Sequence, residues 1–293
     1  MTPIAVPPDW PLRAHSTRVN CRPHLWHVQT LGAGPDILLL HGAGGSTHSF
    51  RHLAPLLAQD HRVLMPDLPG QGFSVLGSRT RTGLDAMAED LIRLCTQENW
   101  HPQAIIGHSA GAAIALRMAE TLPTPLRAII GINAALGNFD GVEGWLFPIL
   151  AKVLALNPLI PRIFSRMSGT PARVQTLIAG TGSTLDAAGL AQYLALVRRP
   201  EHVDGTLSMM AQWKLDGLLS RLHAISTPTL LIAAANDRAV PPQVSVKAAA
   251  RMPNASLAEI AGLGHLCHEE DADSTMALIR PFLAQHLTAT PLP

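Results

Sequence analysis

Gly107-His108-Ser109-Ala110-Gly111 is the stretch that decides the fold, because it places a G-x-S-x-G pentapeptide between a predicted strand and a predicted helix. The short apolar run 103–106 predicts a buried strand, and residues 112–119 predict a helix. A serine on such a sharp turn needs small neighbours, and glycine or alanine fills the positions around it except for His108. The pattern predicts an exposed nucleophile at the start of a helix, whose dipole favours developing negative charge.

The composition is that of a globular and rather apolar protein. The chain has 293 residues, of which 47% are hydrophobic and 15% charged. A net charge of +1 provides no basic field, which argues against nucleic-acid binding. Three cysteines without a framework spacing favour a reducing compartment, and we expect a cytoplasmic protein. The first residues lack the features of a signal peptide, and we expect no membrane span.

Predicted strands alternate with predicted helices along most of the chain. The strands are predicted at 16–21, 24–30, 36–40, 62–65, 103–106, 126–132, 229–234 and 255–260. The helices are predicted at 47–59, 84–96, 112–119, 242–252 and 274–286. This alternation predicts an α/β fold with a mostly parallel, eight-stranded sheet flanked by helices, opened by one antiparallel pair.

Polar residues follow the predicted strands at the points where they end. Ligands of parallel sheets bind at the carboxyl ends of the strands. We therefore expect one polar edge of the sheet, formed by His41, Asp67, Ser109, Asn133 and Asp237.

Residues 139–215 fit no strand pattern and are rich in leucine, isoleucine and aromatic residues. They are predicted to form an inserted helical cap over a core made of residues 1–138 and 216–293. Gly180-Thr181-Gly182-Ser183 is expected to separate short helices of this cap. The predicted lining of an apolar substrate pocket is Trp145, Phe147, Tyr193, Met210 and Trp213.

Two alternatives apply to this cap. Its apolar side chains can simply pack the cap onto the core, and the Tyr193 hydroxyl can bond within the cap. A membrane-surface role for residues 145–164 is less favoured, because the segment lacks the Lys/Arg-rich polar face of interfacial helices.

A nucleophilic serine needs a base, and the base needs an orienting acid. Asp237, directly after the strand 229–234, is the predicted acid, and His265, in a glycine-rich turn after the last strand, is the predicted base. His268 is the competing base. The run from His265 to Glu269 also allows a metal cluster, which we disfavour because zinc sites usually draw ligands from two separate segments.

Two backbone N–H groups are predicted to form an oxyanion hole. One belongs to Ala110, after the serine, and the other to Ala43, in the glycine-rich loop after the strand 36–40. His41 is interpreted as a structural residue of that loop. Asp67 is interpreted as a carboxylate that braces the neighbouring loop.

These motifs resemble those of the α/β-hydrolase fold family in order and over nearly the whole chain. The resemblance is closest to the capped epoxide-hydrolase and haloalkane-dehalogenase branch. That branch often has an aspartate at the position of Ser109, so the serine favours acyl-type hydrolysis here. The resemblance rests on His41-Gly42-Ala43-Gly44, Asp67-Leu68-Pro69-Gly70-Gln71-Gly72, the pentapeptide, Asp237-Arg238-Ala239-Val240-Pro241 and Gly262-Leu263-Gly264-His265.

A narrower resemblance is to the magnesium-chelatase accessory proteins of bacteriochlorophyll biosynthesis. It implies a role near magnesium insertion into protoporphyrin, with magnesium-chelatase subunits as partners and a tetrapyrrole as a candidate apolar ligand. It is carried by residues 108–114, Leu156-Asn157-Pro158-Leu159-Ile160-Pro161, Ala179-Gly180-Thr181-Gly182-Ser183 and residues 237–242.

Three functions remain open at this point. The first is a serine hydrolase acting on an ester or related acyl compound through Ser109, Asp237 and His265, without metal or cofactor. The second is a non-catalytic accessory or porphyrin-binding protein that retains these residues. The third is a cofactor-free perhydrolase, which uses the same residues.

Overall fold

The computed structural model describes residues 4–137 and 159–287. Its centre is an eight-stranded sheet with the order β1-β2-β4-β3-β5-β6-β7-β8. β1 and β2 are antiparallel, β2 is antiparallel to β4, and every other pair is parallel, which confirms the predicted sheet. The strands are Ser16–Cys21, His24–Leu31, Asp36–Leu40, Arg62–Pro66, Pro102–His108, Ala128–Ile132, Thr229–Ala234 and Ala255–Ile260.

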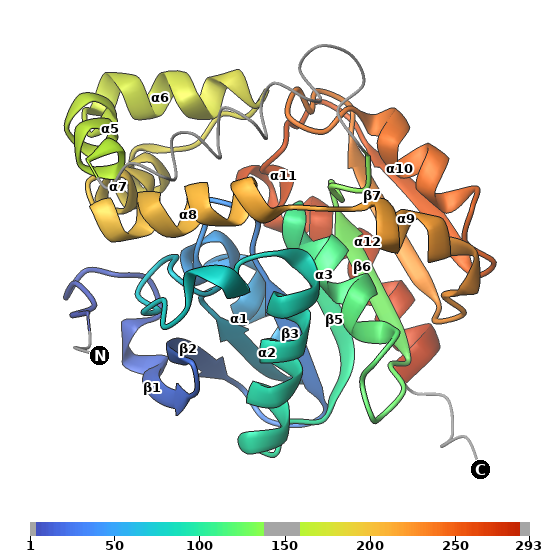
Figure 1. Cartoon of the computed structure of the whole chain (residues 1–293). Helices are drawn as coiled ribbons and strands as arrows, with labels where there is room; N and C mark the ends of the chain where they lie inside the picture. Colours follow the sequence, from blue (N-terminus) through green and yellow to red (C-terminus); the bar gives the residue numbers. More distant parts are fainter. Residues whose placement is uncertain (1–3, 138–158, 288–293) are drawn as a thin grey trace.

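Helices cover both faces of this sheet (Figure 1). They are α1 (Leu53–Leu57), α2 (Leu84–Gln97), α3 (Ala110–Ala119), α9 (Asp216–Arg221), α10 (Pro242–Ala249), α11 (Cys267–Glu270) and α12 (Ala272–Leu287). The helix predicted over 47–59 is wrong as one element. It consists of a 3-10 turn, Thr47–Phe50, followed by α1, and the turn is capped by the Ser46 side chain, which accepts from the His48 N–H. α9 was not predicted.

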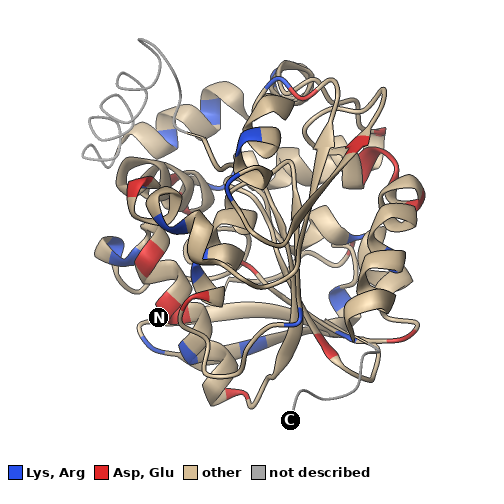
Figure 2. Ribbon diagram, turned by 90° about the vertical axis from the view of Figure 1, so that its right-hand side faces the viewer, with Lys and Arg blue, Asp and Glu red and all other residues tan. Residues whose placement is uncertain are grey.

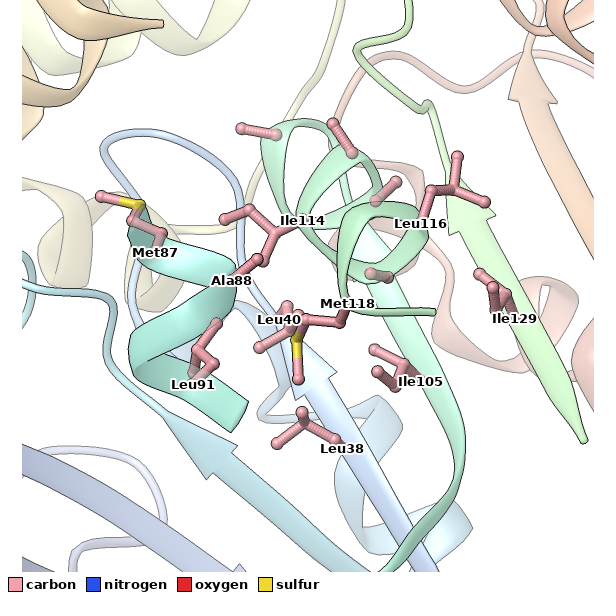
Figure 3. Close-up of a cluster of buried hydrophobic side chains, with 14 of the residues drawn as sticks. Leu38, Leu40, Met87, Ala88, Leu91, Ile105, Ile114, Leu116, Met118 and Ile129 are labelled. Carbon is pink, nitrogen blue, oxygen red and sulfur yellow. The ribbon is translucent and has the colours of Figure 1, made fainter. Parts of the chain in front are cut away.

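The core is divided by the sheet into two apolar layers. Successive residues of a strand point to opposite faces, so Leu38 and Leu40 join one layer while Ile37 and Leu39 join the other. Figure 3 shows the first layer, where β3 and β5 pack against α2 and α3. All the described residues of β3 are buried, as expected for a strand that is covered on both faces.

Among the described residues, four helices precede α9 in the interval between β6 and β7: α5 (Ile160–Ser168), α6 (Pro171–Gly180), α7 (Ala187–Val197) and α8 (Pro200–Gln212). α5 packs on α8, α6 on α7, and α7 on α8, so they form a unit of their own beside the sheet (Figure 1). The Gly180–Ser183 segment separates α6 from α7, as predicted. No strand occurs between residues 159 and 228, and the remainder of the predicted cap, 139–158, lies outside the described residues.

His41, Asp67, Ser109 and Asn133 directly follow β3, β4, β5 and β6. Asp237 is the third residue after β7, so all five lie at one edge of the parallel part of the sheet. Lys/Arg and Asp/Glu positions are interspersed over most of the ribbon in Figure 2. Of the helices that the structure describes, none combines the length and the apolar character that crossing a bilayer requires.

Candidate active site

Ser109 lies on a strained turn between β5 and α3. Its backbone has φ 52° and ψ −116°, a conformation that non-glycine residues rarely adopt. A Cβ on Gly107 would lie 2.4 Å from the Ala112 nitrogen, and one on Gly111 would lie 2.0 Å from the Leu40 carbonyl oxygen. Both positions must therefore be glycine for this turn to form, and strain of this kind is typical of functional sites.

The loops after β7 and β8 bring Asp237 and His265 together. His265 Nδ1 donates to Asp237 Oδ2 over 2.7 Å. The other carboxylate oxygen, Oδ1, accepts from the N–H groups of Ala239 and Val240, each at 2.8 Å. The Asp237 side chain is fully buried, whereas 10% of the His265 side chain is exposed. The pair thus holds an imidazole in one orientation and leaves its Nε2 for another partner.

Within the described part of the chain, the Ser109 hydroxyl makes no hydrogen bond to His265 or to another group. The two segments are nonetheless neighbours, because the ring of His108 lies 4.7 Å from that of His265. Hydrogen bonds between a nucleophile and its base are often long without substrate and shorten in the complex. The structure therefore brings the serine turn beside the imidazole without closing the bond.

Two side chains hold the backbone carbonyl of His265. His108 Nε2 and Asn133 Nδ2 both donate to this oxygen, each over 2.9 Å. Burial, together with the nearby His268 and His265, lowers the pKa of His108 well below its usual value, so its ring is neutral. Sequence reasoning placed Asn133 at this edge but missed both roles. A polar residue directly after a buried strand was the only available signal.

The loop between α6 and α7 fastens the acid loop to the base loop. The Thr181 carbonyl accepts from the N–H groups of Arg238 at 3.1 Å and His265 at 3.3 Å. Ser183 Oγ accepts from the Leu266 N–H at 2.8 Å. A Cβ on Gly182, whose φ is +84°, would lie 1.9 Å from the Asn236 carbonyl oxygen. From the sequence, this loop was predicted only to separate two helices.

The glycine-rich loop after β3 lies against the serine turn. A Cβ on Gly42 would lie 3.0 Å from that of Ser109. The Gly44 N–H donates to Gln71 Oε1 at 2.7 Å, and Gly45 N–H donates to the Gly42 carbonyl at 3.1 Å. The N–H groups of Ala43 and Ala110 have no acceptor among the described residues, so both remain available to a substrate oxygen.

His41 and Asp67 support this loop from inside the protein. His41 Nδ1 donates to the Gly42 carbonyl at 2.8 Å, and its Nε2 accepts from the Leu68 N–H at 2.9 Å. Burial lowers the pKa of His41, which favours the neutral ring that this pattern requires. Asp67 accepts from the N–H groups of Thr47 and Phe73, each at 2.7 Å. These contacts are the ones that a turn residue and a bracing carboxylate make.

His268, the competing base, bonds Ser49 and makes no hydrogen bond to Asp237 in the described structure. Its ring is fully buried, and its Nε2 donates to Ser49 Oγ at 2.9 Å. Burial, with smaller effects of His265 and Arg51, lowers its pKa to about 3. Glu269 bonds Ser49 and Arg51 instead of sharing a centre with His265. His265, His268 and Glu269, which the sequence allowed as a metal cluster, thus bond different partners.

The predicted pocket residues lie in different surroundings. The buried Tyr193 donates its hydroxyl to Glu269 Oε1 at 2.6 Å, so it bonds α11 rather than a group of the cap. Met210 is 40% exposed, and Trp213 packs against the core layer of α2 and α3. Trp145 and Phe147 lie outside the described residues. The pocket assignment therefore stays a prediction.

The matching family model, that of the alpha/beta hydrolase fold, spans residues 35–272. The chain therefore belongs to the α/β-hydrolase fold family. It is 48% identical over 285 residues to the magnesium-chelatase 30 kDa subunit of Rhodobacter capsulatus, covering 97% of this chain and 99% of that protein. It is also 28% identical over 272 residues to 2-hydroxy-6-oxo-6-phenylhexa-2,4-dienoate hydrolase of Burkholderia cepacia, covering 88% and 91%.

Solved structures share the fold at low sequence identity. The epoxide hydrolase CorEH matches with a TM-score of 0.77 and 17% identity, covering 92% of this chain and 98% of that one. A thermophilic esterase from Thermogutta terrifontis matches with a TM-score of 0.72 and 20% identity, covering 92% and 99%. The expected family and the expected similarity to epoxide hydrolases are thus confirmed, and hydrolases recur among the relatives.

Proposed function

We propose that the chain is a serine hydrolase that cleaves an ester or related acyl compound, with Ser109 as nucleophile, His265 as base and Asp237 as orienting acid. The observation that carries the proposal is the buried Asp237–His265 hydrogen bond beside a serine with positive φ at the start of α3. Hydrolases among the relatives support the same class of reaction.

Each residue has one chemical task in the proposed reaction. Ser109 Oγ attacks the substrate carbonyl carbon while His265 Nε2 takes the hydroxyl proton. The Ala43 and Ala110 N–H groups donate to the oxyanion of the tetrahedral intermediate. His265 then protonates the leaving group, and a water molecule activated by the same Nε2 releases the acyl group from Ser109. Asp237 keeps Nδ1 protonated and the ring oriented throughout.

The substrate and the setting are proposed from the relatives and the cap. The identity with a magnesium-chelatase subunit supports a role beside magnesium chelatase in bacteriochlorophyll biosynthesis, with chelatase subunits as partners. A tetrapyrrole ester is the candidate substrate, since the cap residues are largely apolar. Three buried, unpaired cysteines support a cytoplasmic location, because such thiols persist under reducing conditions.

The alternative is a non-catalytic accessory or porphyrin-binding protein. The name of the 48% identical relative, a chelatase subunit rather than a hydrolase, favours it. A binding role survives the substitution Ser109→Ala, whereas hydrolysis and the third possibility, perhydrolysis, do not.

The first test is the intact mass of the protein after treatment with a small fluorophosphonate. The proposed function predicts one covalent adduct, absent in Ser109→Ala, and turnover of an ester in a screen that includes tetrapyrrole esters. An adduct on folded Ser109→Ala, or full esterase turnover by this variant, contradicts the mechanism. A folded wild-type protein that forms no adduct and binds a porphyrin supports the accessory role.

A further inference from the structure

Large apolar side chains are exposed on and beside α5 and on α6. Five of the eight large hydrophobic residues that are most exposed in the described chain lie between residues 159 and 177. Met167 is the extreme, with 61% of its surface exposed. Ile163, Phe164 and Met167 lie within five residues of each other on α5, and neighbouring exposed apolar side chains of this kind mark an interaction site. The five residues are Leu159, Ile163, Phe164, Met167 and Leu177.

The same segment is cationic, although the whole chain is nearly neutral. Residues 159–185 contain Arg162, Arg166 and Arg173 and no aspartate or glutamate. Neither Arg162 nor Arg166 forms a salt bridge with another part of the described chain, whereas Arg51, Arg62, Arg81 and Arg117 all do. A membrane-surface role for residues 145–164 was less favoured from the sequence, because that segment lacks a Lys/Arg-rich polar face. Most of these arginines follow that segment.

An open hollow of about 550 Å³ lies between α5 and the start of α8. Arg162, Arg166 and Arg198 line it, together with Ser165. Arg198 is held there because its Nε donates to the Gly169 carbonyl at 2.9 Å. The Ser165 hydroxyl is buried and has no hydrogen-bond partner in the described structure. Guanidinium groups and a free hydroxyl match the oxygen atoms of a phosphate group.

We propose that the exposed surface of α5, which we name the α5 face and which consists of Arg162, Ile163, Phe164, Arg166 and Met167, docks on an anionic lipid bilayer. Apolar side chains beside arginines on one short helix are the pattern of interfacial helices, whose apolar face enters the headgroup boundary while cations bind lipid phosphates. Ile163, Phe164 and Met167 supply the apolar part. A soluble anion alone would leave these side chains in water, and an apolar partner alone would leave the arginines unpaired.

The position of α5 in the fold permits this contact. Figure 1 shows α5 at the outer corner of the helical unit, away from the sheet. The bilayer would thus meet the protein beside the helices whose α6–α7 loop bonds the acid and base loops. The inference does not depend on the proposed hydrolysis, because it rests on surface residues that bear no part in the mechanism.

Vesicle flotation tests the α5 face directly. Full-length protein is mixed with vesicles of phosphatidylcholine alone or with 30% phosphatidylglycerol (about one anionic lipid in three). We expect flotation with the anionic vesicles only, weakening as salt rises. Phe164→Ser/Arg166→Gln should lower the partition coefficient, with about a fivefold loss from the arginine alone. Val246→Ser/Lys247→Gln on α10, which also removes one exposed apolar residue and one exposed cation, should leave it unchanged.

Several outcomes overturn the proposal. These are no flotation with either vesicle, equal flotation with both, or equal losses in the two double variants. If inorganic phosphate protects the arginines from phenylglyoxal while vesicles do not bind, the hollow is a site for a soluble anion. If the α5 variant changes the sedimentation coefficient, the face joins two copies of the chain. Thermal unfolding of both variants confirms that each is folded.

Discussion

Two serine–histidine–aspartate sets can be compared in the described part of the chain, and their difference defines the candidate site. Ser16, His27 and Asp67 form a closed chain, with His27 Nδ1 donating to Asp67 at 2.7 Å and His27 Nε2 bonded to Ser16 at 2.9 Å. In the other set the Asp237–His265 distance is also 2.7 Å, but Ser109 is not bonded to the imidazole. Judged by hydrogen bonds alone, Ser16, His27 and Asp67 would be the more complete catalytic triad.

The surroundings reverse this ranking. Ser16 has an ordinary extended backbone at the start of β1, with φ −82° and ψ 132°, and no helix begins beside it. His27 is fully buried, and its ring lies against Phe73. Ser109 has a strained backbone at a helix N-terminus, beside two N–H groups without acceptors and an imidazole with an exposed edge. Access to the serine and N–H donors for an oxyanion, more than a complete set of hydrogen bonds, therefore distinguish a candidate catalytic triad from a structural hydrogen-bond network.

The largest expected effect comes from exchanging the two serines for alanine in turn. Ser109→Ala should lower ester turnover by about 10⁴-fold or more, because the nucleophile is lost. Ser16→Ala should leave turnover unchanged. Steady-state hydrolysis of an activated ester by the two variants and the wild type measures this. A large loss in Ser16→Ala with the fold retained would contradict the assignment of the site.

The two aspartates should separate in the same way. Asp237→Asn should lower turnover by about 10⁴-fold, since the amide stabilises the wrong tautomer of His265. Asp67→Asn should instead lower the free energy of unfolding by about 1–3 kcal/mol, because its amide NH₂ would face backbone N–H donors. Turnover and urea unfolding, measured on both variants, give the comparison. Equal losses of turnover and of stability in the two variants would contradict the assignment of a catalytic role to Asp237 and a structural role to Asp67.

The pH dependence of stability provides a third contrast. Burial alone would raise the pKa of Asp67, but the charge and hydrogen bond of His27 outweigh it and lower the pKa from 3.8 to about 2. A lowered carboxyl pKa stabilises the fold above pH 3.8, and this stability is lost as the pH falls toward 2. The shift corresponds to about 2 kcal/mol. Urea unfolding between pH 5 and about 2 should show a smaller decline in Asp67→Asn than in wild type.

A parallel decline of the two proteins would contradict this role of Asp67. Asp36 and Asp90 also have lowered pKa values, Asp36 through Arg62 and His101, and Asp90 through His24 and Arg81, in each case against the effect of burial. They are unchanged in the variant, so the difference between the two curves belongs to Asp67. The measurement therefore reports on the buried Asp67 carboxylate and the partners that lower its pKa, chiefly His27 on β2.

The sequence predicts the sheet well, because its parallel strands are short continuous apolar runs bounded by turn residues, as in residues 37–40. The serine turn is equally predictable, since Gly107 and Gly111 are required by close backbone contacts. The bonds of Thr181 and His108 to the base loop were not predictable. They join segments more than 80 residues apart through a backbone carbonyl, which carries no residue-specific signal. The closed Ser16 set was also missed, because no motif links the side chains of Ser16, His27 and Asp67, which only the pairing of their strands brings together.

The smallest expected effect concerns Tyr193, which sequence analysis assigned either to the substrate pocket or to a structural bond. Its hydroxyl donates to Glu269, whose pKa is raised chiefly by burial, so removing this donor leaves a carboxyl with Ser49 and Arg51 as partners. Tyr193→Phe should lower the free energy of unfolding by about 1 kcal/mol and leave KM unchanged. Met210→Ala is the counterpart, because an exposed side chain contributes little to stability. A KM that rises in Tyr193→Phe while stability stays constant would instead place this hydroxyl on the substrate. Glu269, which accepts from this hydroxyl, would then also lie at the substrate site.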